Sequence, residues 1–109
     1  MAEEIFLSGL MVAHNEEEVI EEALKSLHFC DEIIVVLDRC TDQTASIAKK
    51  YATKVVEGGA GDNFHIEGVR RNTGIEACKG TWVLELDADE RISPELATRA
   101  TIYCLYITM

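Results

Sequence analysis

Residues 32–37 read EIIVVL, a short run in which five apolar side chains, four of them β-branched, follow one glutamate and end at Asp38. A run of this length is too short for a helix and is typical of a strand that is buried on both faces of a sheet. Residues 5–13 (IFLSGLMVA) and 81–86 (TWVLEL) have the same character, and residues 54–57 (KVVE) form a shorter run. The chain therefore predicts four strands.

Helical patterns separate these predicted strands. Asn15 and Glu18 make an approximate capping box, after which apolar residues recur at helical spacing to about Leu27. A second helix is predicted before the third strand, with Thr41 or Asp42 as its N-terminal cap. Each of the first two strands is thus expected to lead directly into a helix.

A weaker helical pattern from about 63 to 78 precedes Gly80, a residue that commonly ends a helix, and residues 58–62 (GGAGD) are expected to form a loop. Strands that alternate with helices favour an α/β fold, in which three layers place a mostly parallel sheet between helices. Ligands of such folds bind beyond the carboxyl ends of the strands. The residues at those ends are therefore the first candidates for a site.

Composition narrows the classes of function. The chain has 109 residues, enough for one domain with a core, and its 20 acidic against 10 basic residues give a formal net charge of −10. An acidic surface repels a phosphate backbone and an anionic membrane, so nucleic acid is not an expected partner. The acidic start MAEEIF is unlike a signal peptide, and no apolar run approaches the length of a transmembrane segment.

The four cysteines are Cys30, Cys40, Cys78 and Cys104, and their spacing matches neither a zinc site nor a disulfide framework. Reduced thiols, mostly buried, are the simpler interpretation. We therefore expect the protein in the reducing cytoplasm, or at the inner face of the membrane.

Three carboxylates follow the fourth predicted strand directly, in the stretch Asp87-Ala88-Asp89-Glu90. In extended backbone, side chains two residues apart point the same way, so Asp87 and Asp89 could converge on one cation. Oxygen ligands without histidine or cysteine suit Mg²⁺ or Mn²⁺. The alternative is a solvated acidic turn before a helix that starts at Ser93-Pro94.

Two further features could carry chemistry. Asp38 ends the second strand, where a carboxylate can accept hydrogen bonds from a nucleoside or can stabilise the following turn. Arg70 and Arg71 are a basic pair in an acidic chain, and a guanidinium can hold a phosphate with two hydrogen bonds. At least one of the two arginines is expected to lie on the surface.

Four stretches in order resemble the glycosyltransferases of family 2: AHNEE (13–17), DEIIVVLDRCTDQT (31–44), RRNTGIEACKGTWV (70–83) and LELDADERISPEL (84–96). The resemblance covers about residues 6–96, and the ordered set is far more specific than any one motif. It implies a Rossmann-like nucleotide-diphospho-sugar transferase fold that binds a nucleotide-diphosphate sugar, most simply a UDP-sugar, and transfers the glycosyl group to a hydroxyl. Within the family, the pattern is most similar to bacterial enzymes of cell-surface polysaccharide or lipopolysaccharide synthesis.

The resemblance also implies roles for individual residues. Asp38 would contact the uracil or another base, and Arg71 would lie near the base or the phosphates. Asp87 would contact the ribose or a metal-bound water, and Asp89 would bind Mn²⁺ or Mg²⁺. The residues after the first strand that would border the base are Ala13, His14, Asn15 and Glu16.

Length is where the chain departs from the family. Residues 1–96 match the donor-binding half, whereas the expected second half, with its catalytic base, has no counterpart, so the catalytic residue is unknown and the chain alone is not expected to transfer sugar. A truncated or frame-shifted gene product, and a nucleotide-sugar binding module without catalysis, are the alternatives. Residues 97–109 (ATRATIYCLYITM) are an atypical apolar, β-prone tail in place of a continuing helix.

This tail and a bare sheet edge predict self-association, since exposed edges and β-prone apolar segments recruit other chains. We expect a homo-oligomer in which the apolar side chains of the tail are buried between chains or folded back as an extra strand. Those side chains are Ile102, Tyr103, Leu105, Tyr106 and Ile107.

Overall fold

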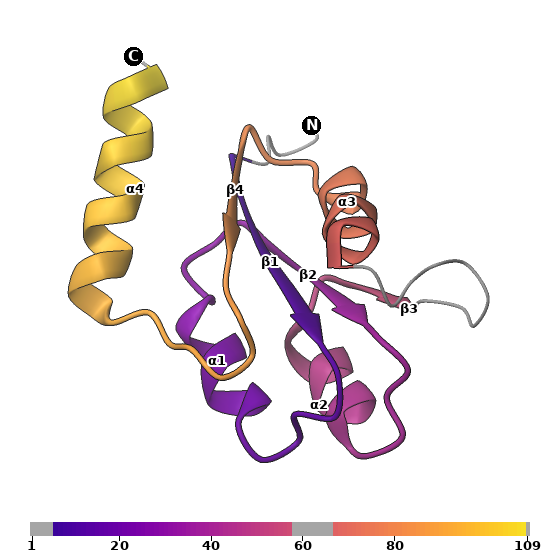
Figure 1. The fold of residues 1–109 in the computed structure, drawn as a ribbon. Coiled ribbons are helices and arrows are strands. Elements are labelled where there is room, and N and C mark those ends of the chain that lie inside the picture. Colours follow the sequence, from indigo (N-terminus) through magenta and orange to yellow (C-terminus); the bar gives the residue numbers. More distant parts are fainter. Residues whose placement is uncertain (1–5, 58–66, 109) are drawn as a thin grey trace.

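The computed structural model describes residues 6–57 and 67–108, and the ribbon in Figure 1 shows strands that alternate with helices. The predicted loop at 58–62 and the start of the third predicted helix lie outside the described residues. The elements in chain order are β1 (Leu7–Ala13), α1 (Ile20–Ser26), β2 (Glu32–Leu37), α2 (Thr44–Tyr51), β3 (Lys54–Glu57), α3 (Glu67–Ala77), β4 (Trp82–Glu85) and α4 (Pro94–Thr108).

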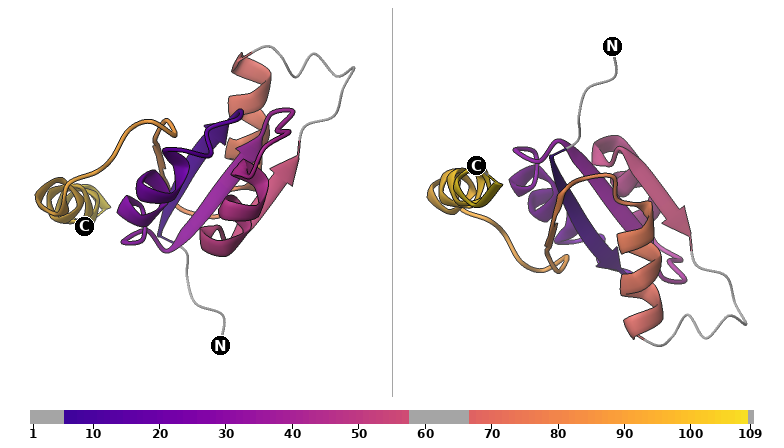
Figure 2. Two further views of the ribbon diagram at one scale, coloured as in Figure 1. Left: turned by 90° about the horizontal axis from the view of Figure 1, so that it is seen from below. Right: turned by 90° about the horizontal axis from the view of Figure 1, so that it is seen from above.

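The four strands form one parallel sheet in the order β3-β2-β1-β4. Helices α1 and α2 cover one face and α3 covers the other, as the two views of Figure 2 show. This arrangement confirms the predicted α/β fold. The register pairs Ala13 of β1 with Leu37 of β2, so both strands end side by side at the same edge.

Strand β2 is the centre of the core, and every one of its six residues is buried. Met11, Val35 and Leu37 pack on the face that α1 and α2 cover. Ile34 and Val36 pack on the face that α3 covers. A continuous apolar run in the sequence thus corresponds to a strand with a layer on each side.

The first helix does not begin with the capping box that Asn15 and Glu18 predicted. Helix α1 begins at Ile20, its N-cap is Val19, and no side chain caps it. Asn15 instead adopts a left-handed backbone conformation with φ of 48°. Its side chain bonds to a residue of the next loop, described below, and is therefore not available to cap the helix.

The prediction of a β-prone tail is wrong, because residues 94–108 form one helix, α4. Ser93 starts it, since its side-chain oxygen accepts the N–H of Leu96 at 3.1 Å and its carbonyl accepts that of Ala97 at 2.9 Å. Extending a started helix costs far less than nucleating one, which explains why the β-prone residues follow in helical conformation. The side chains of 102–109 lie outside the described residues, so their predicted burial is untested.

The first part of α4 packs against the rest of the molecule. Ala97 packs against the core cluster on the α1 side, and the N–H of Ile92, just before the helix, donates to the Ser26 hydroxyl at 3.1 Å. Beyond that part, α4 stands apart from the sheet in all three ribbon views (Figures 1 and 2).

A buried hydrogen-bond network fixes β4 at the amino end of the sheet. The Ser8 hydroxyl donates to the Glu32 carboxylate, which also accepts the N–H of Lys79 at 2.6 Å. The N–H of Gly80 donates to the Ser8 hydroxyl at 2.8 Å. Glu32 is only 4% exposed, so these donors compensate a carboxylate that has lost most of its water.

Replacing Gly80 by alanine is expected to destabilise this corner. The added Cβ would lie 2.6 Å from the Ser8 hydroxyl oxygen and 2.8 Å from the Ser8 backbone nitrogen, distances that force the backbone to move. We expect Gly80→Ala to lower the free energy of unfolding by about 1–3 kcal/mol in urea titrations. Thr81→Ala, at the exposed neighbour, is the control and should change it little. A Gly80→Ala protein as stable as the wild type would contradict the packing described here.

Candidate functional site

Polar side chains gather where β1, β2 and β4 end. His14 follows β1, Asp38 follows β2, and Asp87 lies two residues beyond β4. Arg70 and Arg71 reach the same edge from α3. These five predicted residues therefore lie at the carboxyl edge of the sheet, where ligands of parallel sheets bind.

The loops after β1 and β2 are joined by side-chain hydrogen bonds. The Asn15 amide oxygen accepts the N–H of Thr41 at 2.8 Å, and its amide nitrogen donates to the Thr41 hydroxyl at 3.2 Å. The N–H of Glu16 donates to the Thr44 hydroxyl at 2.8 Å, and the N–H of Gln43 donates to the Glu17 carboxylate at 3.1 Å. Together these bonds make the rim of the site from two linked loops.

Helix α2 begins at Thr44, whose N–H donates to the Asp42 carboxylate at 2.9 Å. Asp42 thus satisfies one N–H at the helix start, although Gln43 occupies the N-cap position and makes no side-chain capping bond. The sequence predicted Thr41 or Asp42 as the N-terminal cap, and the structure places Gln43 there instead, although Asp42 does bond to the helix start.

Asp38 is the buried charge of the site, and it is 3% exposed. Arg39 Nε donates to Oδ1 at 2.9 Å, and Arg70 Nη1 donates to Oδ2 at 2.9 Å. His14 Nδ1 forms a hydrogen bond with the backbone oxygen of Asp38. Burial raises the pKa of Asp38, but the hydrogen bond from Arg39 and the charges of both arginines outweigh it and hold that pKa below the ordinary value.

The two neighbouring arginines serve different partners. Arg70 binds Asp38, whereas Arg71 Nε donates to Glu85 at 3.0 Å. Both arginines line one hollow of about 120 Å³ together with Val12, Glu85 and Asp87. Arg71 is the surface arginine that was expected, since its side chain is 44% exposed, and it lines this hollow all the same.

The contact of Arg70 with Asp38 was not predicted, although the sequence holds a signal for it. Gly74 lies four residues later in α3, and a Cβ there would lie 2.4 Å from Leu10 and 3.0 Å from Val36. Residues four apart share a helix face, so Arg70 lies on the face that packs on the sheet.

The sequence predicted that Asp87 and Asp89 continue the strand in extended backbone, and this prediction is wrong. They belong to a turn in which the N–H of Glu90 donates to the Asp87 carbonyl and the N–H of Asp87 donates to the Glu90 carboxylate, both at 2.9 Å. Ala88 between them is buried, and both aspartates are exposed. The turn fixes Ala88 in the core and leaves an exposed aspartate on each side of it.

The two carboxylates accordingly line different hollows. Asp87 lines the one that holds the arginines. Asp89 lines a second hollow, of about 350 Å³, with residues 15–19 and Asp42. Within residues 6–57 and 67–108 no three histidine, cysteine or acidic side chains are grouped so as to bind a metal by themselves.

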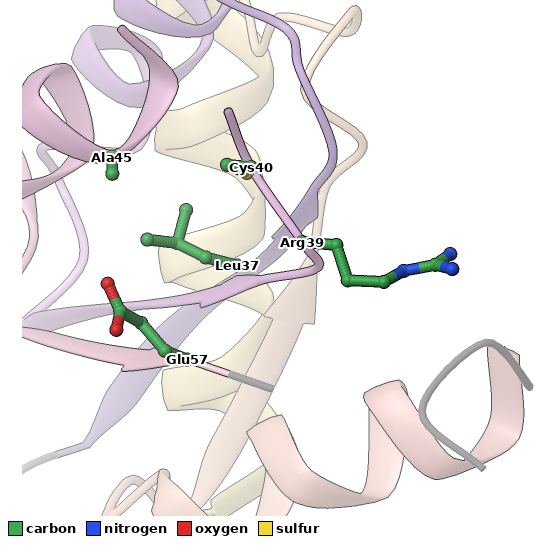
Figure 3. A pocket seen from close by; sticks show the side chains of 5 residues that line it. All are labelled: Leu37, Arg39, Cys40, Ala45 and Glu57. Atoms are coloured by element: carbon green, nitrogen blue, oxygen red, sulfur yellow. The ribbon is translucent and has the colours of Figure 1, made fainter. Parts of the chain in front are cut away.

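Ala13 contributes only its backbone to the site. Its side chain is 1% exposed and belongs to the core, while its carbonyl accepts the N–H of Asp38 at 2.9 Å. A third hollow, of about 170 Å³, lies beyond β2 and β3 and contains none of the predicted site residues (Figure 3). It is lined by Leu37, Arg39, Cys40, Ala45 and Glu57.

Cys30, Cys40 and Cys78 are free thiols, as predicted, but they are partly rather than mostly buried. Burial raises the pKa of each, and in Cys30 burial together with the charge of Asp31 raises it to about 12. These thiols are therefore protonated at neutral pH. In the part of the chain that is described, no helix has the length and apolar character needed to cross a membrane.

Three comparisons with known proteins bear on the site. The family model described as "Glycosyl transferase family 2" matches residues 8–100. The lipopolysaccharide core biosynthesis glycosyltransferase LpsC of Rhizobium meliloti is 32% identical over 95 residues, which cover 83% of this chain and 34% of that protein. The chain spans about a third of the length of LpsC and of three Rickettsia glycosyltransferases that are 35–36% identical to it.

Two solved structures share the fold. Staphylococcus aureus TarS in complex with UDP superposes with a TM-score of 0.79 at 30% identity, over 94% of this chain and 32% of that one. Glucosyl-3-phosphoglycerate synthase from Mycobacterium tuberculosis, in complex with Mn²⁺, UDP and glucosyl-3-phosphoglycerate, superposes with a TM-score of 0.65 at 23% identity, over 80% of this chain and 36% of that one.

The low pKa of Asp38 predicts how stability depends on pH. A carboxyl whose pKa is lowered by folding stabilises the native state above its ordinary pKa, and this stabilisation is lost as the pH falls toward the lowered value. We expect Asp38→Asn to reduce the free energy of unfolding at pH 7 by about 1–3 kcal/mol, because it removes charged hydrogen bonds. The difference from the wild type should shrink as the solution is acidified below the ordinary pKa of aspartate.

Asp89→Asn, which removes an exposed carboxylate at the same edge, is the matched control and should leave the unfolding free energy nearly unchanged at both pH values. Urea titrations at neutral and acidic pH give all four comparisons. A wild type and an Asp38→Asn protein that differ by the same amount at every pH would contradict the role of the Asp38 charge.

Proposed function

The chain belongs to glycosyl transferase family 2, and on that basis we propose that it binds a UDP-sugar at the carboxyl edge of its sheet. The sugar of this donor would be transferred to a hydroxyl acceptor in cell-surface polysaccharide or lipopolysaccharide synthesis. The observation that carries the proposal is the buried, anionic Asp38 held between two arginines at that edge. The likeness to UDP-bound TarS and to LpsC supports the choice of donor and of product class.

Asp38 would accept the ring N–H of the base. Its carboxylate stays charged because Arg39 and Arg70 balance it, and a buried anion is a strong acceptor for a neutral donor. The linked loop residues His14, Asn15 and Glu16, with the backbone of Ala13, would border the base. The bonds between the two loops hold that border in place before the ligand arrives.

Arg71 and Asp87 would meet the rest of the nucleotide. Both line the hollow beside Asp38, so a base on Asp38 would direct its ribose and phosphates toward them. A guanidinium suits the phosphates, and a carboxylate suits the ribose hydroxyls. In an otherwise acidic chain, the arginines supply guanidinium donors at the edge where the anion would lie.

A divalent cation, Mn²⁺ or Mg²⁺, would be held by Asp89, with Asp87 as the second candidate. The exposed carboxylate of Asp89 suits these ions, which bind through one or two carboxylates and complete their shell with phosphate oxygens and water. A set of fewer than three protein ligands is therefore compatible with such a site. The bound cation would stabilise charge on the leaving diphosphate as a Lewis acid.

The free thiols Cys30, Cys40 and Cys78 support a reducing compartment, and we place the protein in the cytoplasm, or at the inner face of the membrane, for this reason. We also propose that the chain self-associates through the β4 edge or through α4. Among the described strands β4 is an outer one, and its Val83 is 40% exposed, while Leu96 of α4 is 52% exposed.

Isothermal calorimetry with UDP, with and without Mn²⁺, tests the donor site. Asp38→Asn should weaken UDP binding by about 10- to 100-fold under both conditions, the cost of one or two charged hydrogen bonds. Asp89→Asn should abolish the gain from Mn²⁺ and leave metal-free binding unchanged. Glu95→Gln on α4, which removes an exposed charge outside the site, is the control. Wild-type affinity in both site variants would refute these assignments.

Light scattering at several protein concentrations tests self-association. A lysine on an edge strand prevents pairing with another chain, so Val83→Lys should yield a monomer if β4 is the contact. Leu96→Lys makes the same change on α4 and should yield a monomer only if α4 is the contact. A wild-type chain that stays monomeric at all concentrations would show that the association proposed here is wrong.

A further inference from the structure

Both carboxylate oxygens of Asp38 are already engaged by arginine. Arg39 Nε bonds to Oδ1 at 2.9 Å, with its Nη2 at 3.5 Å from Oδ2, and Arg70 Nη1 bonds to Oδ2 at 2.9 Å. Asp38 is only 3% exposed, so a base that donates its ring N–H to this carboxylate needs one of the two arginines to move aside. The question is which arginine would yield.

The two arginines differ in how firmly they are held. The side chain of Arg39 is 53% exposed, whereas that of Arg70 is 20% exposed. Arg39 lies in the turn after β2, with a left-handed φ of 50°, and Figure 3 shows its side chain extending away from Leu37, Ala45 and Glu57. Arg70 belongs to α3, which packs on β1 and β2.

Release therefore costs less for Arg39. Water already solvates about half of its side chain and can solvate a freed guanidinium at once. If Arg39 leaves, Asp38 keeps the charge of Arg70, so the buried carboxylate is not left without a counterion. If Arg70 left, a mostly buried guanidinium and a buried carboxylate would separate, which is the costlier change.

We infer that Arg39 is a displaceable competitor for the base: it leaves Asp38 Oδ1 when a ring N–H arrives, while Arg70 stays on Oδ2 as the positioning residue. The inference rests on the proposed function, because it takes Asp38 as the base contact. The role inferred for Arg39 is to lower the affinity of the site for a nucleoside. No covalent change is involved, since one hydrogen bond to Oδ1 replaces another.

The extent to which Arg39 weakens ligand binding should differ between uridine and UDP. With uridine, the freed guanidinium gains no new partner except water. With UDP, the diphosphate adds a second anion near the site, which a freed guanidinium can approach. Arg39 should therefore oppose uridine binding more strongly than UDP binding.

Calorimetric titration of uridine and UDP into the full chain tests this inference. Arg39→Gln should bind uridine about fivefold more tightly than the wild type, which corresponds to the loss of a competing ion pair of about 1 kcal/mol. The gain should be smaller for UDP. Lys49→Gln, which removes one exposed positive charge on α2, controls for net charge and should bind both ligands as the wild type does.

Side-chain NMR of the arginines gives a second readout on the unaltered protein. On saturation with uridine, the Nε–H signal of Arg39 should lose the shift and slow exchange of an ion-paired group, whereas the guanidinium signals of Arg70 should keep them. Unchanged Arg39 signals at saturation, or a folded Arg39→Gln protein that binds uridine no more tightly than the wild type, would overturn the inference and leave the proposed function standing. No binding of UDP or uridine by the wild type or by Arg39→Gln would overturn both.

Discussion

The complete burial of β2 is the constraint on which the rest of the structure depends. All six of its residues lie in the core, so one layer of helices must cover each face of the sheet. The strand has polar residues only at its two ends, Glu32 at its start and Asp38 just after its last residue. The Asp38 carboxylate stays charged because Arg39 and Arg70 reach it, and so the end of one apolar strand becomes the centre of the candidate site.

A buried carboxylate lies at each end of the sheet, and different kinds of donor compensate its lost hydration. At the amino end, the buried Glu32 accepts hydrogen bonds from Ser8 and Lys79 and ties β4 to its neighbours. At the carboxyl end, the buried Asp38 is balanced by arginines that solvent reaches, above all Arg39. The donors to Glu32 are neutral groups inside the protein, and they connect β4 to the rest of the sheet. In the proposed function, the charged and partly exposed donors of Asp38 would exchange with a ligand.

The sequence predicted the order of strands and helices, because continuous apolar runs and helical spacing are local signals. It also placed Asp38 at the correct edge. It could not predict that Asn15 bonds to Thr41 across 26 residues rather than capping a helix, nor that Arg70 rather than Arg71 reaches Asp38. Such outcomes depend on which distant side chains the folded sheet brings close, and β-propensity likewise failed for α4, where a started helix continued.

The central claim is that the carboxyl edge of the sheet binds the nucleotide. Titration of UDP into uniformly ¹⁵N-labelled protein, followed by backbone amide NMR, tests it most directly. If UDP binds there, the shifted amides will cluster at residues 13–16, 38–41 and 85–89, and the amides near Ser8 and Gly80 will stay in place. Shifts at the amino end, or shifts spread evenly over the chain, would contradict the claim.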